Sequence, residues 1–384
     1  MKVVILTGVY PDENGFQGGI FIHNQAKAIA KAGVSVCVLY YDFRSVRRRR
    51  KIGLSKYWLD GIEVYRIAIP CGPIKPVLNF LNRWIVPLSF RYIIKKTDAP
   101  DLINAHFWDA GFISSIISAS CGIPYVVTEH SSGILTNTLS VPEKKKAKEG
   151  YDKANLVIAV SKALKSEIHS ITNTDVITIP NIVPEYMFNY KDTKVDNNRF
   201  TFITVCNLIP SKRVDLTIKA FSILKKSYEE LHLLIVGEGP LKTELYKQSE
   251  RDGCSNDITF LGQVDNKHLE SIYKSCNCFV LPSDFETFGV VFAEALANGL
   301  PVITSNCGGP EEFVCEENGI VVTKNNIEEL VNAMEYMVNN YEEYDRHGLS
   351  QYAKNLFSED SVSKKIIEAF SSSLRTSKVN RHDN

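Results

Sequence analysis

Short apolar runs alternate with amphipathic stretches along almost the whole chain. In the first half, runs rich in β-branched residues predict strands over 2–9, 34–41, 62–69, 102–105, 125–128, 156–160 and 176–179. In the second half they predict strands over 200–205, 231–236, 258–260, 278–281, 301–304 and 319–322. Helices are expected between them, from Val214, from Leu241 and around Glu294. This alternation is typical of parallel sheets covered by helices.

The alternation lapses once, in a polar stretch between the two halves. We therefore predict an N-terminal Rossmann-like domain over 1–185, a linker over 186–199 and a second Rossmann-like domain over 200–355. A helical segment over 356–384 is expected to return to the first domain. Doubly wound sheets bind ligands at the carboxyl ends of their strands, so two of them facing each other predict a cleft lined by strand-end loops.

Composition narrows the choice of class. Lys and Arg number 44 and so do Asp and Glu, which gives no global argument for a nucleic-acid partner. Nine cysteines without metal-ligand spacing indicate reduced thiols in a cytoplasmic protein. The first apolar run is too short for a signal peptide, and no apolar run reaches bilayer-spanning length.

The stretch from Pro282 to Pro301 carries the strongest chemical signal. Around Glu294 the residues from Val290 to Ala297 are all apolar, and an ionised carboxylate is costly to bury without a partner. The start of this helix offers unpaired N–H groups to an anion, and Gly289 leaves room for a phosphate. Glu294, about two turns further in, would then accept hydrogen bonds from hydroxyl groups, a ribose being the obvious candidate. The alternative is a buried glutamate satisfied by a lysine or by the backbone.

The same residues resemble a known family. Glu286 and Glu294, with seven residues between them and followed by Ala-Asn-Gly-Leu-Pro, look like the donor-binding signature of glycosyltransferase family 4, retaining enzymes of the GT-B fold. Glycine motifs that are individually weak occur in the family's order along nearly the whole chain: Gly18-Gly19, Val236-Gly-Glu-Gly-Pro240, Leu261-Gly262 and Gly308-Gly309.

The resemblance implies that the domain over 1–185 binds the acceptor and that the domain over 200–355 binds the nucleotide sugar. It also implies roles for particular residues. Glu294 should bind the nucleotide ribose, Glu286 the hydroxyls of the donor sugar, and Lys212 the diphosphate. Asn207 stands where the family commonly has an arginine, so the diphosphate would depend more heavily on Lys212. The remaining expected donor contacts are Gly19, Gly237, Gly262, Gln263, Val264, Phe288, Gly289 and Val290.

In the first domain, His106 ends a predicted strand and is expected to face the cleft, close to the anomeric centre. With Glu286 and Lys212 it completes the candidate catalytic set, while Glu129 and His130 are candidate acceptor contacts. The predicted reaction moves a sugar from a nucleotide-diphosphate donor to a saccharide or lipid-linked acceptor hydroxyl, with retention. No Asp-x-Asp pair occurs in the chain, so we expect no metal and no other cofactor.

A basic loop suggests a membrane partner. Residues 1–110 contain 16 Lys and Arg against 8 Asp and Glu. Much of this excess of positive charge comes from one cluster: Arg44, Arg47, Arg48, Arg49, Arg50, Lys51 and Lys56. Together with the apolar and basic run 76–90, it would hold the protein peripherally on an anionic membrane, as suits cell-surface polysaccharide or glycolipid assembly. A merely solvated loop is the alternative.

Two other classes remain open. A Rossmann-type oxidoreductase is disfavoured because no Gly-x-Gly-x-x-Gly follows the first strand. A non-catalytic nucleotide-sugar-binding protein is disfavoured because Glu286, Glu294, Lys212 and His106 are all present.

Overall fold

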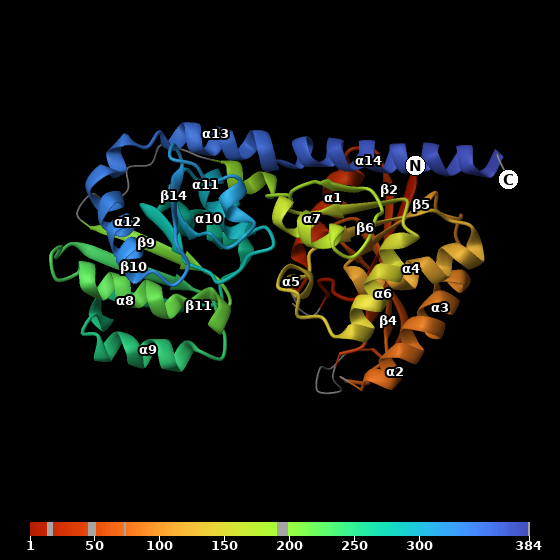
Figure 1. Cartoon of the computed structure of the whole chain (residues 1–384), viewed down its shortest axis with the longest axis horizontal. Coiled ribbons are helices and arrows are strands. Elements are labelled where there is room, and N and C mark those ends of the chain that lie inside the picture. The colour runs from red at the N-terminus through yellow and green to blue at the C-terminus, as the bar shows by residue number, and fades with distance from the viewer. Residues whose placement is uncertain (14–17, 45–50, 73, 190–198, 383–384) are drawn as a thin grey trace. The chain divides into compact units, whose positions relative to one another are not determined.

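The computed structural model describes residues 1–13, 18–44, 51–72, 74–189 and 199–382. The chain forms two compact units, one of residues 1–182 with 359–384 and one of residues 183–358 (Figure 1). The linker expected over 186–199 begins within the 3-10 turn Glu185–Phe188, and its residues 190–198 lie outside the described part.

Unit 1 is built on an eight-stranded sheet in the order β3-β4-β2-β1-β5-β6-β7-β8. All neighbours are parallel except β3, which pairs antiparallel with β4. The strands are β1 (Lys2–Thr7), β2 (Ser35–Asp42), β3 (Gly53–Leu59), β4 (Ile62–Ala68), β5 (Leu102–His106), β6 (Tyr125–Glu129), β7 (Leu156–Ala159) and β8 (Val176–Thr178). The direction of winding reverses between β1 and β5, which marks the crevice where such sheets bind ligands.

The helices of unit 1 cover both faces of this sheet. They are α1 (Ile20–Lys31), α2 (Lys75–Phe80), α3 (Val86–Ile94), α4 (Trp108–Cys121), α5 (Ser132–Leu135), α6 (Val141–Asp152), α7 (Lys162–His169) and α14 (Glu359–His382). A π-helical turn, Leu81–Ile85, joins α2 to α3 just before Pro87. Proline lacks an N–H and clashes with the preceding turn, and the wider π turn accommodates it.

The C-terminal helix α14 belongs to the core of unit 1. Val362, Ile366 and Phe370 recur at helical spacing and are buried in the same apolar cluster as β1, β2 and α1. Helix α14 contacts α1 and β6 directly. The last 24 described residues therefore complete the N-terminal unit from the far end of the sequence.

Unit 2 has a six-stranded, fully parallel sheet in the order β11-β10-β9-β12-β13-β14. Its strands are β9 (Phe200–Val205), β10 (Leu231–Val236), β11 (Ile258–Gly262), β12 (Cys278–Leu281), β13 (Val302–Ser305) and β14 (Gly319–Val322). Its helices are α8 (Val214–Leu224), α9 (Lys242–Arg251), α10 (Asn266–Lys274), α11 (Val290–Ala297), α12 (Ile327–Asn340) and α13 (Arg346–Phe357). This is the Rossmann order, with its switch point between β9 and β12.

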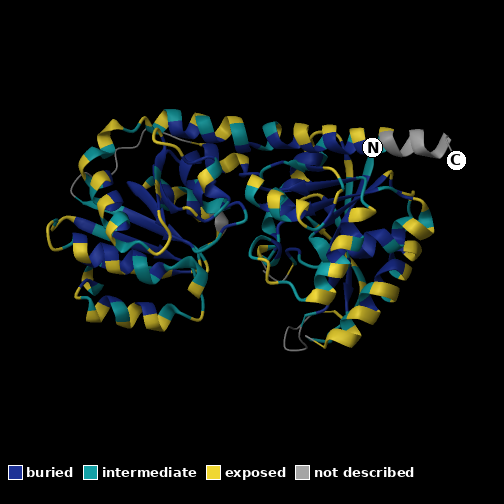
Figure 2. Ribbon diagram, in the orientation of Figure 1, coloured by how far each residue is buried: buried dark blue, intermediate teal, exposed yellow. Residues whose placement is uncertain are grey.

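The predicted fold class, two doubly wound α/β domains, is confirmed, and Figure 2 shows the strands of each sheet buried beneath half-exposed helices. Strands β9, β10, β12 and β14 and the start of α8 lie at their predicted residues. The hairpin strand β3 was not predicted. It is an edge strand whose residues alternate between half-buried and exposed positions, so it lacks the apolar run by which the other strands were recognised.

Candidate functional site

The switch point of unit 2 brings Lys212 and Glu286 together. Lys212 lies in the loop after β9 and Glu286 in the loop after β12, and these strands are neighbours in the sheet. The Lys212 ammonium contacts Glu286 Oε1 at 2.7 Å. The Ser283 hydroxyl donates to the same oxygen at 2.9 Å. Both members of the ion pair are largely buried, with 20% of the lysine and 10% of the glutamate side chain exposed.

Backbone hydrogen bonds fix this pair. The Asp284 amide donates to the Ser211 carbonyl at 2.8 Å, which ties the two strand-end loops to each other. The Glu286 amide donates to the Cys307 carbonyl and the Glu286 carbonyl accepts from Gly309, both at 2.9 Å. The loop after β13 thereby supports the loop after β12, and Glu286 has little freedom to move away from Lys212.

Helix α11 starts directly beyond this pair. Its N-cap is Gly289 with φ +80°, and a Cβ there would stand 2.7 Å from Pro310 Cγ, so only glycine fits. No side chain caps the helix, which leaves its first N–H groups available to an anion. The Phe288 side chain packs against Phe313 and Phe357 instead of facing the loop surface, so its expected donor contact would have to come from its backbone.

Glu294 lies on α11, where the sequence predicted a carboxylate among apolar residues. Burial raises its pKa to about 7, partly offset by the Tyr273 hydroxyl, which donates to Oε2 at 3.3 Å. Burial also raises the pKa of Tyr186 to about 12, and the Glu294 charge adds to that shift. Glu294 is thus held by a tyrosine rather than by a lysine or the backbone, the two partners that the sequence suggested. No pattern in the sequence links Tyr273 to Glu294, so this partner could not have been predicted.

Three glycines let loops approach each other closely beside this site. Gly237 has φ +135°, and a Cβ there would overlap the Cys206 carbonyl oxygen at 1.8 Å. Its amide donates to the carbonyl of Gly262, which also has positive φ. Gly239 would meet the Leu208 carbonyl in the same way. The loops after β9, β10 and β11 are therefore stacked backbone to backbone.

The other expected donor contacts lie at the surface of these loops. Asn207 and Gln263 are exposed, while Val264 and Val290 are half-buried. In unit 1, Gly19 caps α1 with φ +78°, and a Cβ there would stand 2.7 Å from the Val9 carbonyl oxygen. The structure brings Lys212, Glu286 and Gly289 together; Gly19 belongs to the other unit.

His106 ends β5 as predicted, but its imidazole is fully buried and does not face open space. Nδ1 lies 3.0 Å from His130 Nε2, and Nε2 lies 2.9 Å from Asn104 Oδ1. Burial lowers the pKa of His106 well below its usual value, so the ring is neutral at pH 7. His130 covers it, packed against Phe21 at a centroid distance of 4.6 Å, and burial lowers the pKa of His130 to about 3.

Glu129 is also fully buried, and its carboxylate accepts hydrogen bonds from the backbone of the loop that follows β6. Its Oε1 accepts from the amides of His130 and Ser131 at 2.9 and 2.7 Å, and the Tyr151 hydroxyl donates to Oε2. Burial raises its pKa to about 7. An acceptor contact from Glu129 or His130 stays a prediction, and for Glu129 it would require replacement of these internal bonds.

Much of the predicted basic cluster cannot be placed, because Arg47, Arg48, Arg49 and Arg50 lie outside the described residues. Arg44 is paired with Asp42 at 2.7 Å. Lys51 is exposed, and Lys56 forms an ion pair with Glu63.

Within the described ranges, no helix is both long and apolar enough to cross a bilayer. The same part of the chain holds no group of three or more His, Cys, Asp and Glu side chains placed to bind a metal ion.

Comparisons with known proteins agree with this architecture. Residues 18–185 match the family described as Glycosyltransferase Family 4, and residues 188–356 match Glycosyl transferases group 1. An uncharacterized glycosyltransferase of Haemophilus influenzae is 30% identical over 66% of this chain and 70% of its own length. A putative teichuronic acid biosynthesis glycosyltransferase of Bacillus subtilis is 25% identical over 87% of this chain and 88% of its own.

Solved structures share the fold at low identity. HepE of Anabaena, in complex with UDP, superposes with a TM-score of 0.76 at 20% identity, covering 97% of this chain and all of that one. The two doubly wound sheets and the two family matches together identify the family. The chain belongs to glycosyltransferase family 4 and has the GT-B fold.

Proposed function

We propose that this glycosyltransferase moves a hexose from a nucleotide-diphosphate sugar to an acceptor hydroxyl with retention, without a metal ion. The observation that carries the proposal is the Lys212–Glu286 pair beside the uncapped start of α11. A diphosphate at this point would meet one ammonium group and the helix N–H groups, the charges that a leaving nucleotide needs. UDP is the first nucleotide to test, because HepE was solved with UDP and with UDP-glucose.

Each site residue has a distinct task in this proposal. Lys212 exchanges its contact with Glu286 for the diphosphate, and stabilises the charge that grows there as the glycosidic bond breaks. Glu286, released from Lys212, accepts hydrogen bonds from the donor sugar. Glu294 accepts them from the ribose, replacing its bond to Tyr273.

Two features of the chain favour activity without a metal. The chain has no Asp-x-Asp pair, and the carboxylates of the site already have partners that substrate hydroxyls would replace. The test is release of nucleotide from UDP-glucose and related donors after treatment with EDTA. Unchanged release supports the proposal; loss with recovery on adding Mg²⁺ or Mn²⁺ contradicts it. UDP binding without release of nucleotide on any acceptor would instead support a binding protein.

We also propose a peripheral membrane location, carried by the helical segment from α2 to α3. Its exposed apolar side chains are Ile74, Val77, Phe80, Trp84, Leu88 and Tyr92. Exposed cations stand beside them: Lys75, Arg83, Arg91, Lys95 and Lys96. At about 1 kcal/mol for each basic residue near an anionic surface, this set would hold the protein on a membrane. The relative named for teichuronic acid biosynthesis makes cell-surface polymers a suitable class of product.

Sedimentation with vesicles containing phosphatidylglycerol measures this binding. The bound fraction should fall as salt rises, and Trp84→Ser with Leu88→Ser should weaken it at every salt concentration. Ile223→Ser on α8, an exposed apolar residue of the other unit, is the matched control. Absence of binding at low salt would contradict the proposal.

A further inference from the structure

Helix α1 begins directly against the loop that follows β1. A Cβ at Gly19 would stand 2.7 Å from the Val9 carbonyl oxygen and 3.2 Å from Tyr10 Cα, so the two backbones are in contact. Gly19 is one of the expected donor contacts, and no side chain caps the helix that starts after it. The position of the Val9–Tyr10 peptide therefore determines where Gly19 can lie.

One residue of α1, His23, holds both of these segments. Its backbone N–H donates to the Gly19 carbonyl at 3.3 Å. Its ring nitrogen Nδ1 lies 2.7 Å from the Tyr10 hydroxyl, and the two rings meet edge to face with centroids 5.5 Å apart. Both side chains are buried, so this hydrogen bond is shielded from water. His23 thus joins the start of its own helix to the loop after β1.

The partners of His23 determine which of its nitrogens carries the proton. Burial lowers the pKa of His23, against the effect of Asp60, so the ring is neutral at pH 7. The Asp60 carboxylate lies 3.1 Å from Nε2 and can only accept, so Nε2 is the protonated nitrogen. Nδ1 then has a free lone pair, and the Tyr10 hydroxyl must donate to it. Lys27, whose ammonium lies 3.1 Å from the same carboxylate, holds Asp60 from the surface.

The hairpin of β3 and β4, which the sequence did not predict, supports this arrangement at two points. Asp60 lies in the two-residue turn that joins the strands and has φ +46°, a conformation that is uncommon outside glycine. On β3, the Tyr57 hydroxyl donates to the Pro11 carbonyl at 2.9 Å. The turn therefore orients His23, and the strand holds the loop one residue beyond Tyr10.

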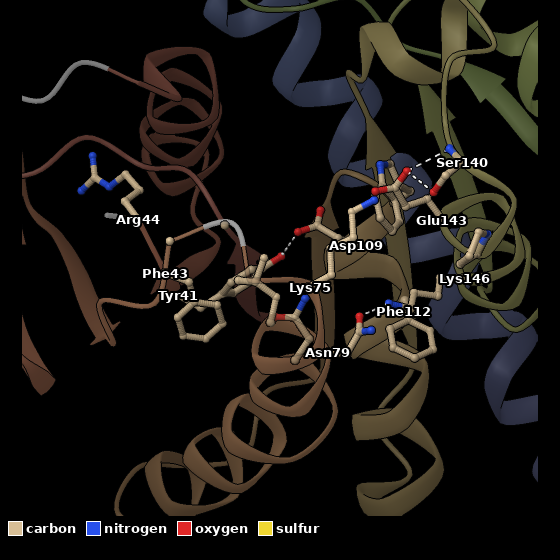
Figure 3. Close-up of a pocket in the computed structure, with 16 residues that line it drawn as sticks. Tyr41, Phe43, Arg44, Lys75, Asn79, Asp109, Phe112, Ser140, Glu143 and Lys146 are labelled. Atoms are coloured by element: carbon tan, nitrogen blue, oxygen red, sulfur yellow. Dashed lines mark hydrogen bonds between the residues drawn. The ribbon is translucent and has the colours of Figure 1, made fainter. Parts of the chain in front are cut away.

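Two arginines hold the next residues of the loop. Arg44 Nη2 lies 3.4 Å from Asp12 Oδ2, and Arg66 Nη2 lies 3.1 Å from Glu13 Oε1. Figure 3 shows Arg44 directed away from the other labelled residues of a neighbouring cavity of about 510 Å³, which Gly8 also lines. Side chains from four elements thus hold the loop, and Tyr10 is held at the point where it touches Gly19.

We propose that His23 is a positioning residue for sugar transfer. Through Tyr10 it holds the loop after β1 against Gly19, and Asp60 fixes the tautomer that this requires. A displacement of about 1 Å can cost about a hundredfold in rate, so a small movement of Gly19 would be measurable. The effect on transfer rests on the proposed function, whereas the hydrogen-bonded chain of Tyr10, His23 and Asp60 does not.

Nitrogen NMR of protein labelled with ¹⁵N in the histidine rings tests the chain of hydrogen bonds without any assay of activity. The chain has eight histidines, and the resonances that are lost in His23→Gln identify His23. At pH 7.5 they should show a neutral ring protonated on Nε2, and Tyr10→Phe should shift the Nδ1 resonance. A ring protonated on Nδ1, or on both nitrogens, would overturn the proposal.

Two substitutions of His23 separate its two hydrogen bonds. In His23→Asn the amide oxygen replaces Nδ1 and can still accept from Tyr10, whereas in His23→Gln the amide nitrogen replaces Nε2 and only the bond to Asp60 is kept. His23→Gln and Tyr10→Phe should each lower kcat for nucleotide release about ten- to a hundredfold, and His23→Asn should retain most of the rate. The Kd for UDP, measured by calorimetry, should change less than threefold in all three. The double variant Tyr10→Phe with His23→Gln should be no slower than either single variant, because both remove the same bond.

Tyr125→Phe is the matched control. Its buried hydroxyl donates to the Gly150 carbonyl at 2.6 Å, at the opposite end of the same sheet, so the variant loses a comparable bond far from the loop. It should lower the midpoint of urea unfolding about as much as Tyr10→Phe does and leave kcat unchanged. An equal fall in kcat in Tyr125→Phe, or equal rates in His23→Asn and His23→Gln, would overturn the positioning role. If the wild type neither binds UDP nor releases nucleotide, the proposed function is wrong, and the tautomer measurement alone decides whether the His23 chain exists.

Discussion

Replacing Glu286 by Gln should strengthen UDP binding while it impairs turnover. In the protein without ligand, the Lys212 ammonium is 2.7 Å from the Glu286 carboxylate, and both are largely buried. Two unit charges at that distance attract by about 6 kcal/mol at an effective dielectric constant of 20, before desolvation is subtracted. About 1.5–3 kcal/mol is the usual net value of a hydrogen bond to a charged group. A diphosphate must compete with this contact for Lys212.

Glutamine keeps the shape and can still accept from Ser283, but it removes the negative charge. Lys212 then becomes available, and the repulsion between a carboxylate and the incoming diphosphate disappears. A gain of about 1–2 kcal/mol corresponds to a five- to thirtyfold lower Kd for UDP. Turnover should fall at least a hundredfold, because the carboxylate proposed to bind the donor sugar is lost.

Calorimetric titration with UDP, at low and at high salt, measures the first effect, and release of nucleotide measures the second. Asp284→Asn is the matched control, since Asp284 lies in the same loop but pairs with Arg213. In a Lys212→Met background, Glu286→Gln should no longer strengthen binding through that lysine. If Glu286→Gln weakens UDP binding as much as Lys212→Met does, the exchange of partners at Lys212 is refuted.

The remaining predictions concern three other positions. Lys212→Ala should lower turnover about a hundredfold or more, the scale for loss of one preorganised donor, and a normal rate would contradict its role. Glu294→Ala should weaken donor binding by about 2–3 kcal/mol, as measured by calorimetry. Glu294 has a folded pKa of about 7, above that of the unfolded chain, so its ionisation makes stability fall as pH rises from about 4.5 to 7. In Glu294→Gln, the free energy of unfolding should fall by about 2 kcal/mol less than in the wild type between pH 5 and pH 8, as measured by urea unfolding. If the variant differs from the wild type by the same amount at both pH values, the shift of the Glu294 pKa is refuted. Gly237→Ala should destabilise unit 2 by several kcal/mol in the same assay, because its Cβ would overlap the Cys206 carbonyl oxygen, whereas Gly253→Ala, with nothing within 4 Å, is the control for positive φ alone.

The sequence predicted the strands with buried faces because such strands are nearly continuous apolar runs. Strand β9 and strand β12 could be located to the residue, and with them the loops that hold Lys212 and Glu286. Strand β3 was missed because only one of its faces is covered. Glu294 was identified because it is a charged residue among apolar neighbours, which can be seen from the sequence alone.

Contacts between residues that are far apart in the sequence could not be predicted in the same way. Lys212 and Glu286 are 74 positions apart, and the family resemblance implied a separate substrate partner for each without indicating that they would bind each other. His106 was placed correctly at the end of β5, but the ring of His130, from the neighbouring strand-end loop, covers it. The exposure of His106 depends on side-chain packing between two loops, and no pattern in the sequence predicts that packing.

In the protein without ligand, Lys212 and Glu294 are each held by a single contact. Lys212 is held by a single carboxylate oxygen, and Glu294 by one tyrosine hydroxyl at the long distance of 3.3 Å. Each contact offsets part of the desolvation of a partly buried charged group, so the protein can fold with the site empty. Each is also weaker than what a nucleotide sugar offers, because a diphosphate has several anionic oxygens and a ribose has two vicinal hydroxyls. In the proposed donor complex, binding energy would therefore be gained from groups that are already largely desolvated in the folded protein, and little of it would be lost in removing water from them.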